Sequence, residues 1–279
     1  MKMHLPLLLL FAGALCAAPR IVIHGHRGAA AVLPENTLPS FREAIRAGAD
    51  YIELDLHVSR DNVLIVYHDP EINLSICQGP GGKRPIRELT LAEIKQYDCG
   101  SLKPPAFPHQ RPSPGARIPT FDEVLELAKS SQVRFNIEIK YNEKWKPAPP
   151  PREEFVQMVS AAIRRHKLED RVLVQSFDFG IVKAMRALEP GFLLAALYGA
   201  GARSFPDIAR ETGAQIVTPQ YKLVTPEKVK EAHAAGIQVV PWTVDDAAEW
   251  QRLIDAGVDG IITNDPGALA AFLRSKGLR

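Results

Sequence analysis

The sequence lacks a charge surplus of either sign, and it lacks any apolar run long enough to span a bilayer. Its 34 Lys and Arg residues nearly balance 32 Asp and Glu residues, which leaves a formal charge of +2. Nucleic-acid binding needs clustered basic residues, and a membrane span needs ~18–20 apolar residues in a row. We therefore expect neither a nucleic-acid partner nor a membrane span. Nothing in the sequence implies a protein partner either, and 46% hydrophobic residues suffice for a full globular core.

Cysteine is scarce: there are three, and the first, Cys16, lies in a distinctive N-terminal segment. Residues 1–18 begin with the cationic Lys2, continue with an apolar run at 7–11 and end in small residues. This order is typical of a secretory signal peptide. A buried N-terminal strand or helix is the alternative, and Cys16 matches a lipoprotein anchor poorly. We expect cleavage near residues 16–18 and an exported protein, periplasmic or secreted, that comprises residues 19–279.

The two remaining cysteines, Cys77 and Cys99, form an even pair. In an oxidising compartment such a pair predicts a disulfide, with two free buried thiols as the alternative. Closing a loop of this size stabilises the fold by about 3 kcal/mol in the chain-entropy treatment.

Short β-branched, apolar runs alternate with amphipathic stretches from residue 21 onward. The strand-like runs are 21–26, 51–58, 133–140, 171–177, 192–198, 215–219, 237–243 and 258–263. The helical stretches are 37–48, 120–130, 151–167, 179–189, 204–213, 226–235, 246–256 and 267–276. Eight strand–helix alternations predict an α/β fold, an eightfold β/α barrel of the TIM type, with an open doubly wound sheet as the alternative. The first strand is not followed by the spaced glycines of a dinucleotide-binding loop.

Proline is unevenly placed. Of 23 prolines, eight lie in 80–119 and four in 147–151, and both stretches follow predicted strands. Loops after strands lie at the carboxyl-terminal mouth of a β/α barrel, where active sites are built. We therefore expect one catalytic barrel domain, residues 19–279, with residues 69–119 as a small cap inserted after the second strand.

Ionisable residues cluster at four predicted strand ends. The segments are His24-Gly25-His26-Arg27-Gly28, Glu53-Leu54-Asp55, Tyr67-His68-Asp69 and Asn136-Ile137-Glu138-Ile139-Lys140. If Asp61 and Asn62 form a two-residue hairpin turn, Asp55 pairs with His68. Glu53, Asp55 and His68 then share one face of the hairpin. A three-residue turn would shift the pairing by one residue.

The residue types at these strand ends suggest a metal-assisted reaction. Glu53, Asp55 and Glu138 offer hard oxygen ligands for one divalent ion, Ca²⁺ or Mg²⁺. The alternative is a structural ion-pair network with Arg27 and Lys140, but three buried carboxylates are costly without a cation.

Two histidines and two basic residues complete the predicted site. His26 and His68 suit a general acid and a general base, and Arg27 with Lys140 suits a phosphate group. Trp242 either forms an apolar wall of the substrate site or only packs against other residues of the protein. His24 is expected lower in the barrel as a hydrogen-bonded core residue, and Asn36-Thr37 either caps the first helix or orients a ligand.

Together these segments resemble the glycerophosphodiester phosphodiesterases. The matching motifs are His26-Arg27-Gly28, Pro34-Glu35-Asn36-Thr37, Glu53-Leu54-Asp55, His68-Asp69, Glu138-Ile139-Lys140, Trp242-Thr243-Val244 and Gly257-Val258-Asp259-Gly260-Ile261-Ile262-Thr263. The resemblance covers about residues 21–270. It implies a barrel with a cap after the second strand and metal-dependent hydrolysis of glycerophosphodiesters to sn-glycerol 3-phosphate and an alcohol.

By the same resemblance, His26 and His68 are the acid/base pair, Glu53, Asp55 and Glu138 hold the metal, and Arg27 and Lys140 contact the phosphate. The Asp61-Asn62 turn replaces a common Asp-Gly, and residues 103–117 are unusually rich in proline. Two alternatives are enzymes on the same barrel, a lysophospholipase D and a sphingomyelinase D-like enzyme. The third is a protein that binds phosphodiesters without cleaving them. The histidine pair disfavours the third.

Overall fold

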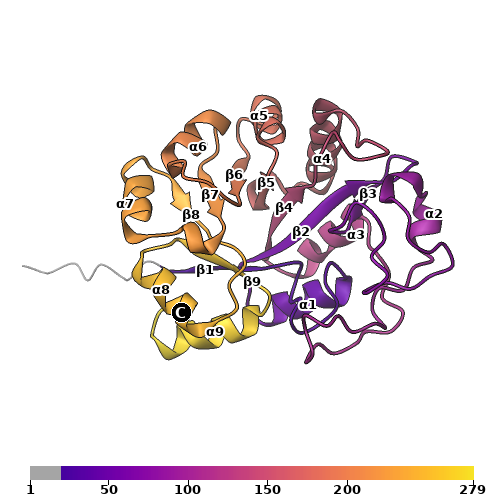
Figure 1. Ribbon diagram of the computed structural model, residues 1–279, viewed down its shortest axis with the longest axis horizontal. Coiled ribbons are helices and arrows are strands. Elements are labelled where there is room, and N and C mark those ends of the chain that lie inside the picture. Colours follow the sequence, from indigo (N-terminus) through magenta and orange to yellow (C-terminus); the bar gives the residue numbers. More distant parts are fainter. Residues whose placement is uncertain (1–19) are drawn as a thin grey trace, which may run out of the picture.

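Eight parallel strands form a nearly closed barrel with helices between them (Figure 1). This computed structural model describes residues 20–279, so the predicted signal peptide, residues 1–18, lies outside the described residues. The strands are β1 (Val22–Gly25), β2 (Tyr51–Val58), β4 (Arg134–Ile139), β5 (Val172–Ser176), β6 (Leu193–Tyr198), β7 (Ile216–Pro219), β8 (Gln238–Val239) and β9 (Gly260–Thr263). Their order is β8-β7-β6-β5-β4-β2-β1-β9. The predicted eightfold β/α barrel is therefore confirmed.

Backbone hydrogen bonds bridge the seam between β8 and β9. The Asp259 N–H donates to the Val239 carbonyl at 3.0 Å, and the Ile262 N–H donates to the Pro241 carbonyl at 2.9 Å. Strand β8 is shorter than the predicted run 237–243. Pro241 has no N–H to donate, which breaks the regular ladder there. The seam is thus held by a few bonds and carries the loop that leads to α8.

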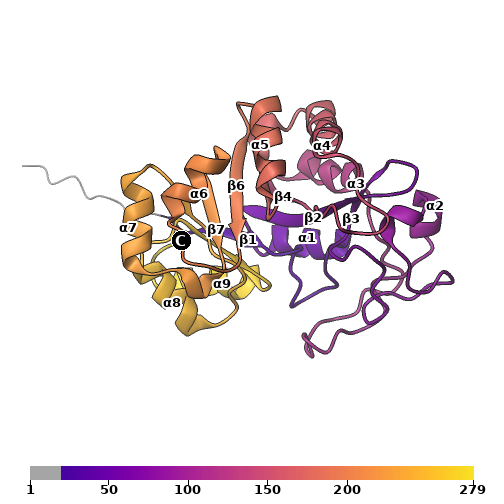
Figure 2. The ribbon, with the colours of Figure 1, turned by 45° about the horizontal axis from the view of Figure 1, so that its top comes forward.

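The helices cover the outside of the barrel (Figure 2). They are α1 (Leu38–Arg46), α3 (Phe121–Leu125), α4 (Arg152–His166), α5 (Phe179–Leu188), α6 (Phe205–Thr212), α7 (Pro226–Ala234), α8 (Ala247–Asp255) and α9 (Pro266–Ser275). Short 3₁₀ turns lie at Glu126–Ser130, Glu169–Arg171 and Tyr221–Leu223. Side-chain oxygens start most of these helices; for example, Thr37 caps α1 and Asp246 caps α8. Within residues 20–279, no helix combines the length and the apolar character that crossing a membrane requires.

The main core lies between the strands and these helices, and a smaller one fills the barrel interior. Along β2, Leu54 and Leu56 point outward into the main core, while the alternating Glu53 and Asp55 point the other way. The hydrophobic pattern of the strand therefore selects which residues reach the barrel interior.

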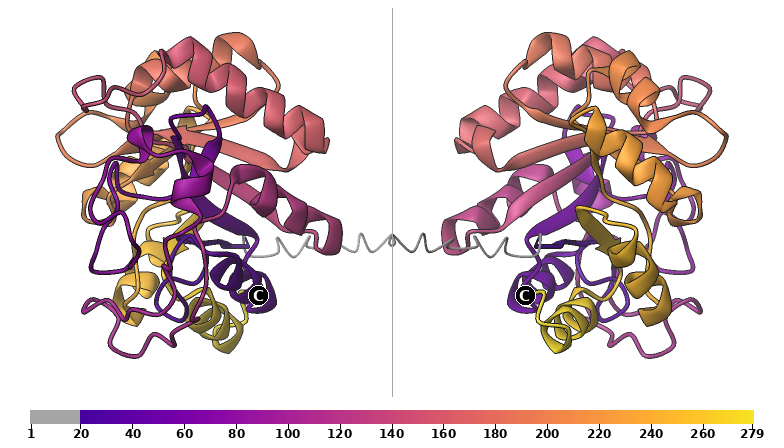
Figure 3. Two further views of the ribbon diagram at one scale, coloured as in Figure 1. Left: turned by 90° about the vertical axis from the view of Figure 1, so that its right-hand side faces the viewer. Right: turned by 90° about the vertical axis from the view of Figure 1, so that its left-hand side faces the viewer.

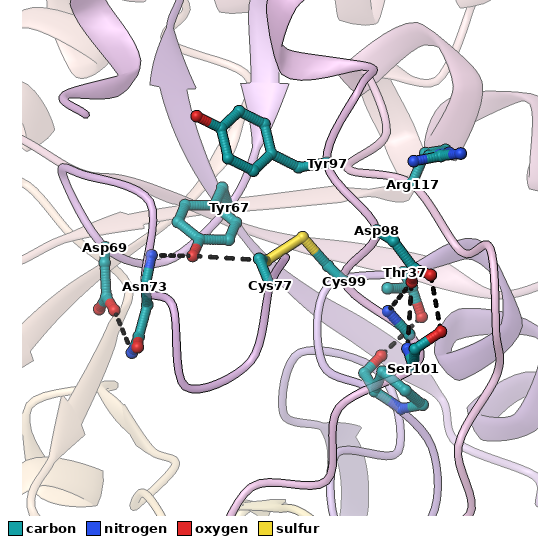
Figure 4. Close-up of a disulfide and its surroundings, with 12 residues drawn as sticks. Thr37, Tyr67, Asp69, Asn73, Cys77, Tyr97, Asp98, Cys99, Ser101 and Arg117 are labelled. Atoms are coloured by element: carbon teal, nitrogen blue, oxygen red, sulfur yellow. Dashed lines mark hydrogen bonds between the residues drawn. A yellow bond between two sulfur atoms is a disulfide. The ribbon is translucent and has the colours of Figure 1, made fainter. Parts of the chain in front are cut away.

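Residues 69–119 form a separate lobe beside the barrel, purple to magenta in Figure 3. The lobe contains a 3₁₀ turn at Ile86–Glu88 and the short helix α2 (Leu91–Ile94), and it packs on the hairpin strand β3 (Leu64–Val66). The lobe and this hairpin share a core that includes Tyr67, Ile72, Ile94 and Tyr97. The predicted disulfide between Cys77 and Cys99 is present inside this core (Figure 4).

The predicted two-residue hairpin turn after β2 is wrong. Leu56 pairs with Val66 and His57 with Ile65, so Asp55 lies opposite Tyr67, not opposite His68. The loop has three residues, because the Ser59 N–H donates to the Val63 carbonyl at 2.9 Å. A two-residue turn of the favoured type needs positive φ at both positions, whereas only Asn62, at +58°, has it among these loop residues. The shared face that was expected for His68 on this hairpin does not exist.

Candidate active site

All eight residues predicted for the site lie at the carboxyl-terminal mouth of the barrel. Seven of them line one cavity of about 100 Å³, together with residues that were not predicted. The seven are His26, Arg27, Glu53, His68, Glu138, Lys140 and Trp242. The eighth, Asp55, does not line the cavity but contacts Arg27 and Lys140, which do. His68 reaches the cavity from the chain that leaves β3 and not as a strand partner of Asp55.

The turn after β1 places Arg27 against the acidic cluster. Gly28 has φ of +89°, and a Cβ there would lie 2.5 Å from the Ser40 hydroxyl, so the turn requires glycine. Arg27 itself has φ of +49°. In this conformation the Arg27 backbone N–H donates to Glu53 Oε2 at 2.8 Å. The His-Arg-Gly sequence therefore ties the first strand end to the second.

Three carboxylates converge, and two of them, Glu53 and Glu138, line the cavity. Asp55 and Glu138 are register partners on β2 and β4, and Glu53 lies two residues before Asp55. One ligand oxygen from each lies within 4.8 Å of the others, and all three residues are buried. Burial, followed by repulsion from Asp55 and Glu138, raises the pKa of Glu53 well above its usual value. Burial likewise raises the pKa of Glu138 against the opposing effect of Lys140.

Two cations partly offset this charge. Lys140 Nζ lies 3.2 Å from Asp55 Oδ1 and 2.9 Å from Glu138 Oε1. Arg27 pairs with Glu35 at 2.8 Å and lies 3.6 Å from Asp55. Burial alone would raise the pKa of Asp55, but Lys140 and Arg27 lower it far below its usual value.

These four acidic groups therefore face two basic ones, and Lys140 is the cation nearest to the buried Asp55 Oδ1. A surplus of negative charge on hard carboxylate oxygens fits a divalent cation. The residues present are thus suited to the metal that the sequence predicts.

The two histidines are each anchored through Nδ1, but by different groups. His26 Nδ1 lies 2.7 Å from the Asn264 side-chain oxygen. His68 Nδ1 lies 2.7 Å from Asp69, which also accepts a 2.9 Å bond from the Asn73 amide (Figure 4). Desolvation, reinforced by repulsion from Arg27, lowers the pKa of His26 to about 3. The His68 hydrogen bond is the main cause of a lowered pKa at Asp69.

Apolar side chains form one wall of the cavity. Phe177 meets Trp242 edge to face at 5.3 Å between ring centroids, and Leu197 adds to the same wall. The Trp242 ring N–H donates to the Thr218 carbonyl at 2.8 Å, which holds the indole in place. Phe177 is 46% exposed, which is high for a large apolar side chain. Trp242 thus packs and also lines the cavity.

Several residues of the site were missed or left open from the sequence. Asn36 is one of them: its amide donates to Asp55 Oδ2 at 2.8 Å, so it orients a carboxylate, whereas Thr37 caps α1. Asn264 and Gln175 were missed, because the sequence shows only that each is a polar residue near the end of a predicted strand. His24 is the expected core residue, bonded to the Asn136 amide at 3.2 Å and stacked on Tyr51.

A larger cavity, of about 620 Å³, lies at the opposite end of the barrel. Its lining includes Arg20, His24, Asp50 and Arg134. Ile23 N–H, Arg20 and Arg279 bind Asp50, and Tyr51 accepts a bond from Arg134, so these charges are engaged in structural contacts. Conversion of a substrate is expected at the smaller cavity, where the carboxylates and the two histidines converge.

Comparison with known proteins agrees with this geometry. Residues 26–268 match the glycerophosphoryl diester phosphodiesterase family. A glycerophosphodiester phosphodiesterase from Caldanaerobacter subterraneus is 33% identical over 92% of this chain and all of its own length. A solved structure from Silicibacter pomeroyi, assigned to the same activity, superposes with a TM-score of 0.87 at 30% identity and covers 93% of this chain and 95% of its own.

A lysophospholipase D from Rattus norvegicus is a more distant relative, 26% identical over 90% of this chain and 85% of its own length. The chain belongs to the glycerophosphodiester phosphodiesterase family, and its predicted class, a phosphoric diester hydrolase, is confirmed.

Proposed function

We propose that this member of the glycerophosphodiester phosphodiesterase family cleaves small glycerophosphodiesters to sn-glycerol 3-phosphate and an alcohol by metal-assisted histidine catalysis. One observation supports this most strongly: three buried carboxylates converge, and two of them line one small cavity together with two Nδ1-anchored histidines. A phosphodiester carries one negative charge, and cleaving it needs one proton removed and one delivered. The cavity offers a group for each task.

Glu53, Asp55 and Glu138 would hold one divalent ion, Ca²⁺ or Mg²⁺. When bound, such an ion supplies positive charge to a phosphate oxygen and lowers the pKa of a coordinated hydroxyl. Lys140 and Arg27 remain next to the same carboxylates and present further cations to the phosphate. Arg27 offers a planar fork and Lys140 a point charge.

The two histidines are suited to opposite roles in the first step. Burial keeps His26 neutral, so it takes the proton of the glycerol 2-hydroxyl as that oxygen attacks phosphorus. His68 is anchored by the Asp69 carboxylate through Nδ1, and it gives a proton to the departing alcohol oxygen. The bond from phosphorus to the alcohol breaks as the new bond forms, which gives a cyclic phosphate. Water then opens the ring with the two histidine roles reversed.

The apolar wall of Phe177, Leu197 and Trp242 is suited to the carbon atoms of the glycerol. Because this wall binds no charge, it would orient the 2-hydroxyl toward His26 without opposing the phosphate. A fixed orientation of this kind contributes much of the rate in intramolecular attack.

Incubation of the metal-loaded protein with glycerophosphocholine, glycerophosphoethanolamine and lysophosphatidylcholine tests the proposal. We expect glycerol 3-phosphate from the first two and a loss of roughly 10²- to 10⁴-fold in kcat for His26→Ala and for His68→Ala. Near-normal turnover in either variant would refute the histidine assignment. Full activity after exhaustive chelation would refute the metal.

A lysophospholipase D activity is the second candidate. The relative from Rattus norvegicus carries that name, and the exposed Phe177 at the cavity could contact an acyl chain. This candidate predicts choline and lysophosphatidic acid from lysophosphatidylcholine in the same panel. A sphingomyelinase D-like preference would appear only with sphingomyelin added as a fourth substrate. A protein that binds phosphodiesters without cleaving them would release no product from any substrate.

We further propose that the protein is exported after removal of residues 1–18. The disulfide inside the lobe of residues 69–119 supports this, since disulfides persist in oxidising compartments. The amino-terminal sequence of protein recovered from the periplasm or the medium should begin near residue 17 to 19. Recovery of the intact chain from the cytoplasm alone would contradict export.

A further inference from the structure

The polarity of one hydrogen-bonded chain at the barrel seam determines which nitrogen of His26 carries a proton. The chain runs from Asp245, in the loop between β8 and α8, through Asn264, directly after β9, to His26, directly after β1. His26 lies 238 positions from Asn264 in the sequence, and Asn264 lies 19 positions from Asp245. Only closure of the barrel brings the three residues together.

Asp245 orients the Asn264 amide. Asp245 Oδ2 lies 2.7 Å from the Asn264 side-chain nitrogen, and Asp245 Oδ1 accepts the Asn264 backbone N–H at 2.8 Å. Thr263 Oγ1 donates to the same Oδ1 at 3.0 Å. An ionised carboxylate only accepts hydrogen bonds, so the NH₂ group of Asn264 must face it. The Asn264 side-chain oxygen is then left to face His26.

The orientation of Asn264 in turn determines the His26 tautomer. The amide oxygen has no proton to donate, so at 2.7 Å His26 Nδ1 must carry the proton. With the proton on Nε2, two lone pairs would face each other at that distance. In neutral His26 the unprotonated nitrogen is therefore Nε2, which has no partner among residues 20–279 and belongs to a side chain that lines the cavity.

The backbone holds Asn264 in place as well. The Ala31 N–H donates to the Asn264 carbonyl at 3.0 Å, and the His26 N–H donates to the Thr263 carbonyl at 2.8 Å. Asn264 is 8% exposed, so water competes little for its amide. Rotation of the side chain would break the bond to Asp245 and the bond to His26 together.

We propose that Asn264, oriented by Asp245, is a positioning residue that holds His26 with its proton on Nδ1 and presents Nε2 to the substrate hydroxyl. The inference rests on the proposed function, in which His26 is the base of the first step. The proton leaves the hydroxyl oxygen and binds Nε2, while the Nδ1 proton stays on the bond to Asn264. The partner of His68 differs in charge: Asp69 is a carboxylate, whereas the Asn264 amide oxygen orients the His26 ring without adding a charge.

The test combines nitrogen NMR of ¹⁵N-histidine-labelled protein with steady-state kinetics. In the metal-loaded wild type, the His26 resonances, assigned by their loss in His26→Ala, should show a protonated Nδ1 and an unprotonated Nε2. Asn264→Ala should give mixed tautomers and lower kcat roughly 10²- to 10⁴-fold, with KM changed by less than about threefold. Asp245→Ala should have a smaller effect in the same direction, roughly 10- to 100-fold.

Asp246→Ala is the matched control, because Asp246 is the adjacent exposed carboxylate and caps α8 without contacting Asn264. It should cost stability but leave kcat and the tautomer unchanged. Circular dichroism of each variant is used to check that it is folded at the assay temperature.

A wild-type His26 with its proton on Nε2 would overturn the inference, as would an unchanged kcat in folded Asn264→Ala. An equal loss of kcat in Asp246→Ala and Asp245→Ala would also overturn it. If the wild type released no product from any phosphodiester, the proposed function would fail, while the NMR spectrum would still report the tautomer. The two failures are therefore distinguishable.

Discussion

Breaking the disulfide between Cys77 and Cys99 should lower the stability of the protein and leave its chemistry intact. The cross-link closes a loop with a sequence separation of 22 residues. Both cysteines are buried in the core of the 69–119 lobe, where Cys77 Sγ lies 3.7 Å from the Tyr67 hydroxyl (Figure 4). Reduction removes the covalent restraint and keeps both sulfur atoms in the core.

The expected magnitude follows from the loop length. Restoring the conformational freedom of a 22-residue loop to the unfolded chain costs about 3 kcal/mol of stability. For a domain of this size each kcal/mol corresponds to about 2–4 °C, so the unfolding midpoint should fall by roughly 6–12 °C. Because the effect acts on the unfolded state, kcat at 25 °C should stay within about twofold.

The assay compares oxidised and reduced wild type with the variant Cys77→Ala/Cys99→Ala by thermal and urea unfolding. The variant also loses the packing of two sulfur atoms, so its midpoint should lie below that of the reduced wild type. Reductant should shift the wild type and leave the variant unchanged, which controls for effects of reductant elsewhere.

A shift of less than about 2 °C on reduction would refute the reasoning, since the lobe would then unfold independently of the barrel. Loss of activity in folded, reduced protein would refute it in another way. It would show that the contacts running from Cys77 through Tyr67 and Asn73 to Asp69 need the covalent bond to position His68.

Three further predictions concern the cavity. The pKa of Glu53 and of Glu138 is raised in the fold, so the free energy of unfolding of chelated protein should fall as pH rises above 4.5. In urea unfolding at a series of pH values, Glu53→Gln should make this fall less steep. An equally steep fall in the variant would contradict the burial of a Glu53 carboxylate as its cause. Lys140→Met leaves Asp55 without its closest cation, so it should lower the free energy of unfolding by roughly 3–5 kcal/mol without metal and by less with saturating Ca²⁺. Equal losses of stability in both conditions would argue against a metal at this site. Trp242→Ala should raise KM and lower kcat, because the apolar wall both binds the glycerol carbons and orients the 2-hydroxyl for attack. Unchanged kinetic constants would refute the wall.

The fold was readable from the sequence because β/α periodicity is local. Each strand run carries its own β-branched pattern and each helix its own polar face, so the eight alternations could be counted without a structure. The chemistry of Glu53 and Asp55 was also readable, since residues two apart on a strand share a face whatever else the chain does.

The hairpin register was not readable, because two loop lengths compete for the same sequence. The choice depends on the loop conformation, in which only Asn62 has positive φ, and on Asp61, which accepts bonds from the Ser59 hydroxyl and the distant Leu91 N–H. His68 nevertheless lines the cavity, from a position two residues beyond the end of β3. The prediction that His68 lies beside the acidic cluster was right, and the prediction that it pairs with Asp55 across the hairpin was wrong.

The sequence by itself determined the barrel, the acidic and basic residues at its strand ends and the pairing of two cysteines, because these depend on periodicity and on residue type. Only the tertiary structure decided how the histidines are held. The partner of His26 is Asn264, which the barrel seam brings from the other end of the chain, and its orientation depends on a third residue, Asp245. Hydrogen-bond polarity of this kind depends on which atoms meet in space, and no local pattern encodes it.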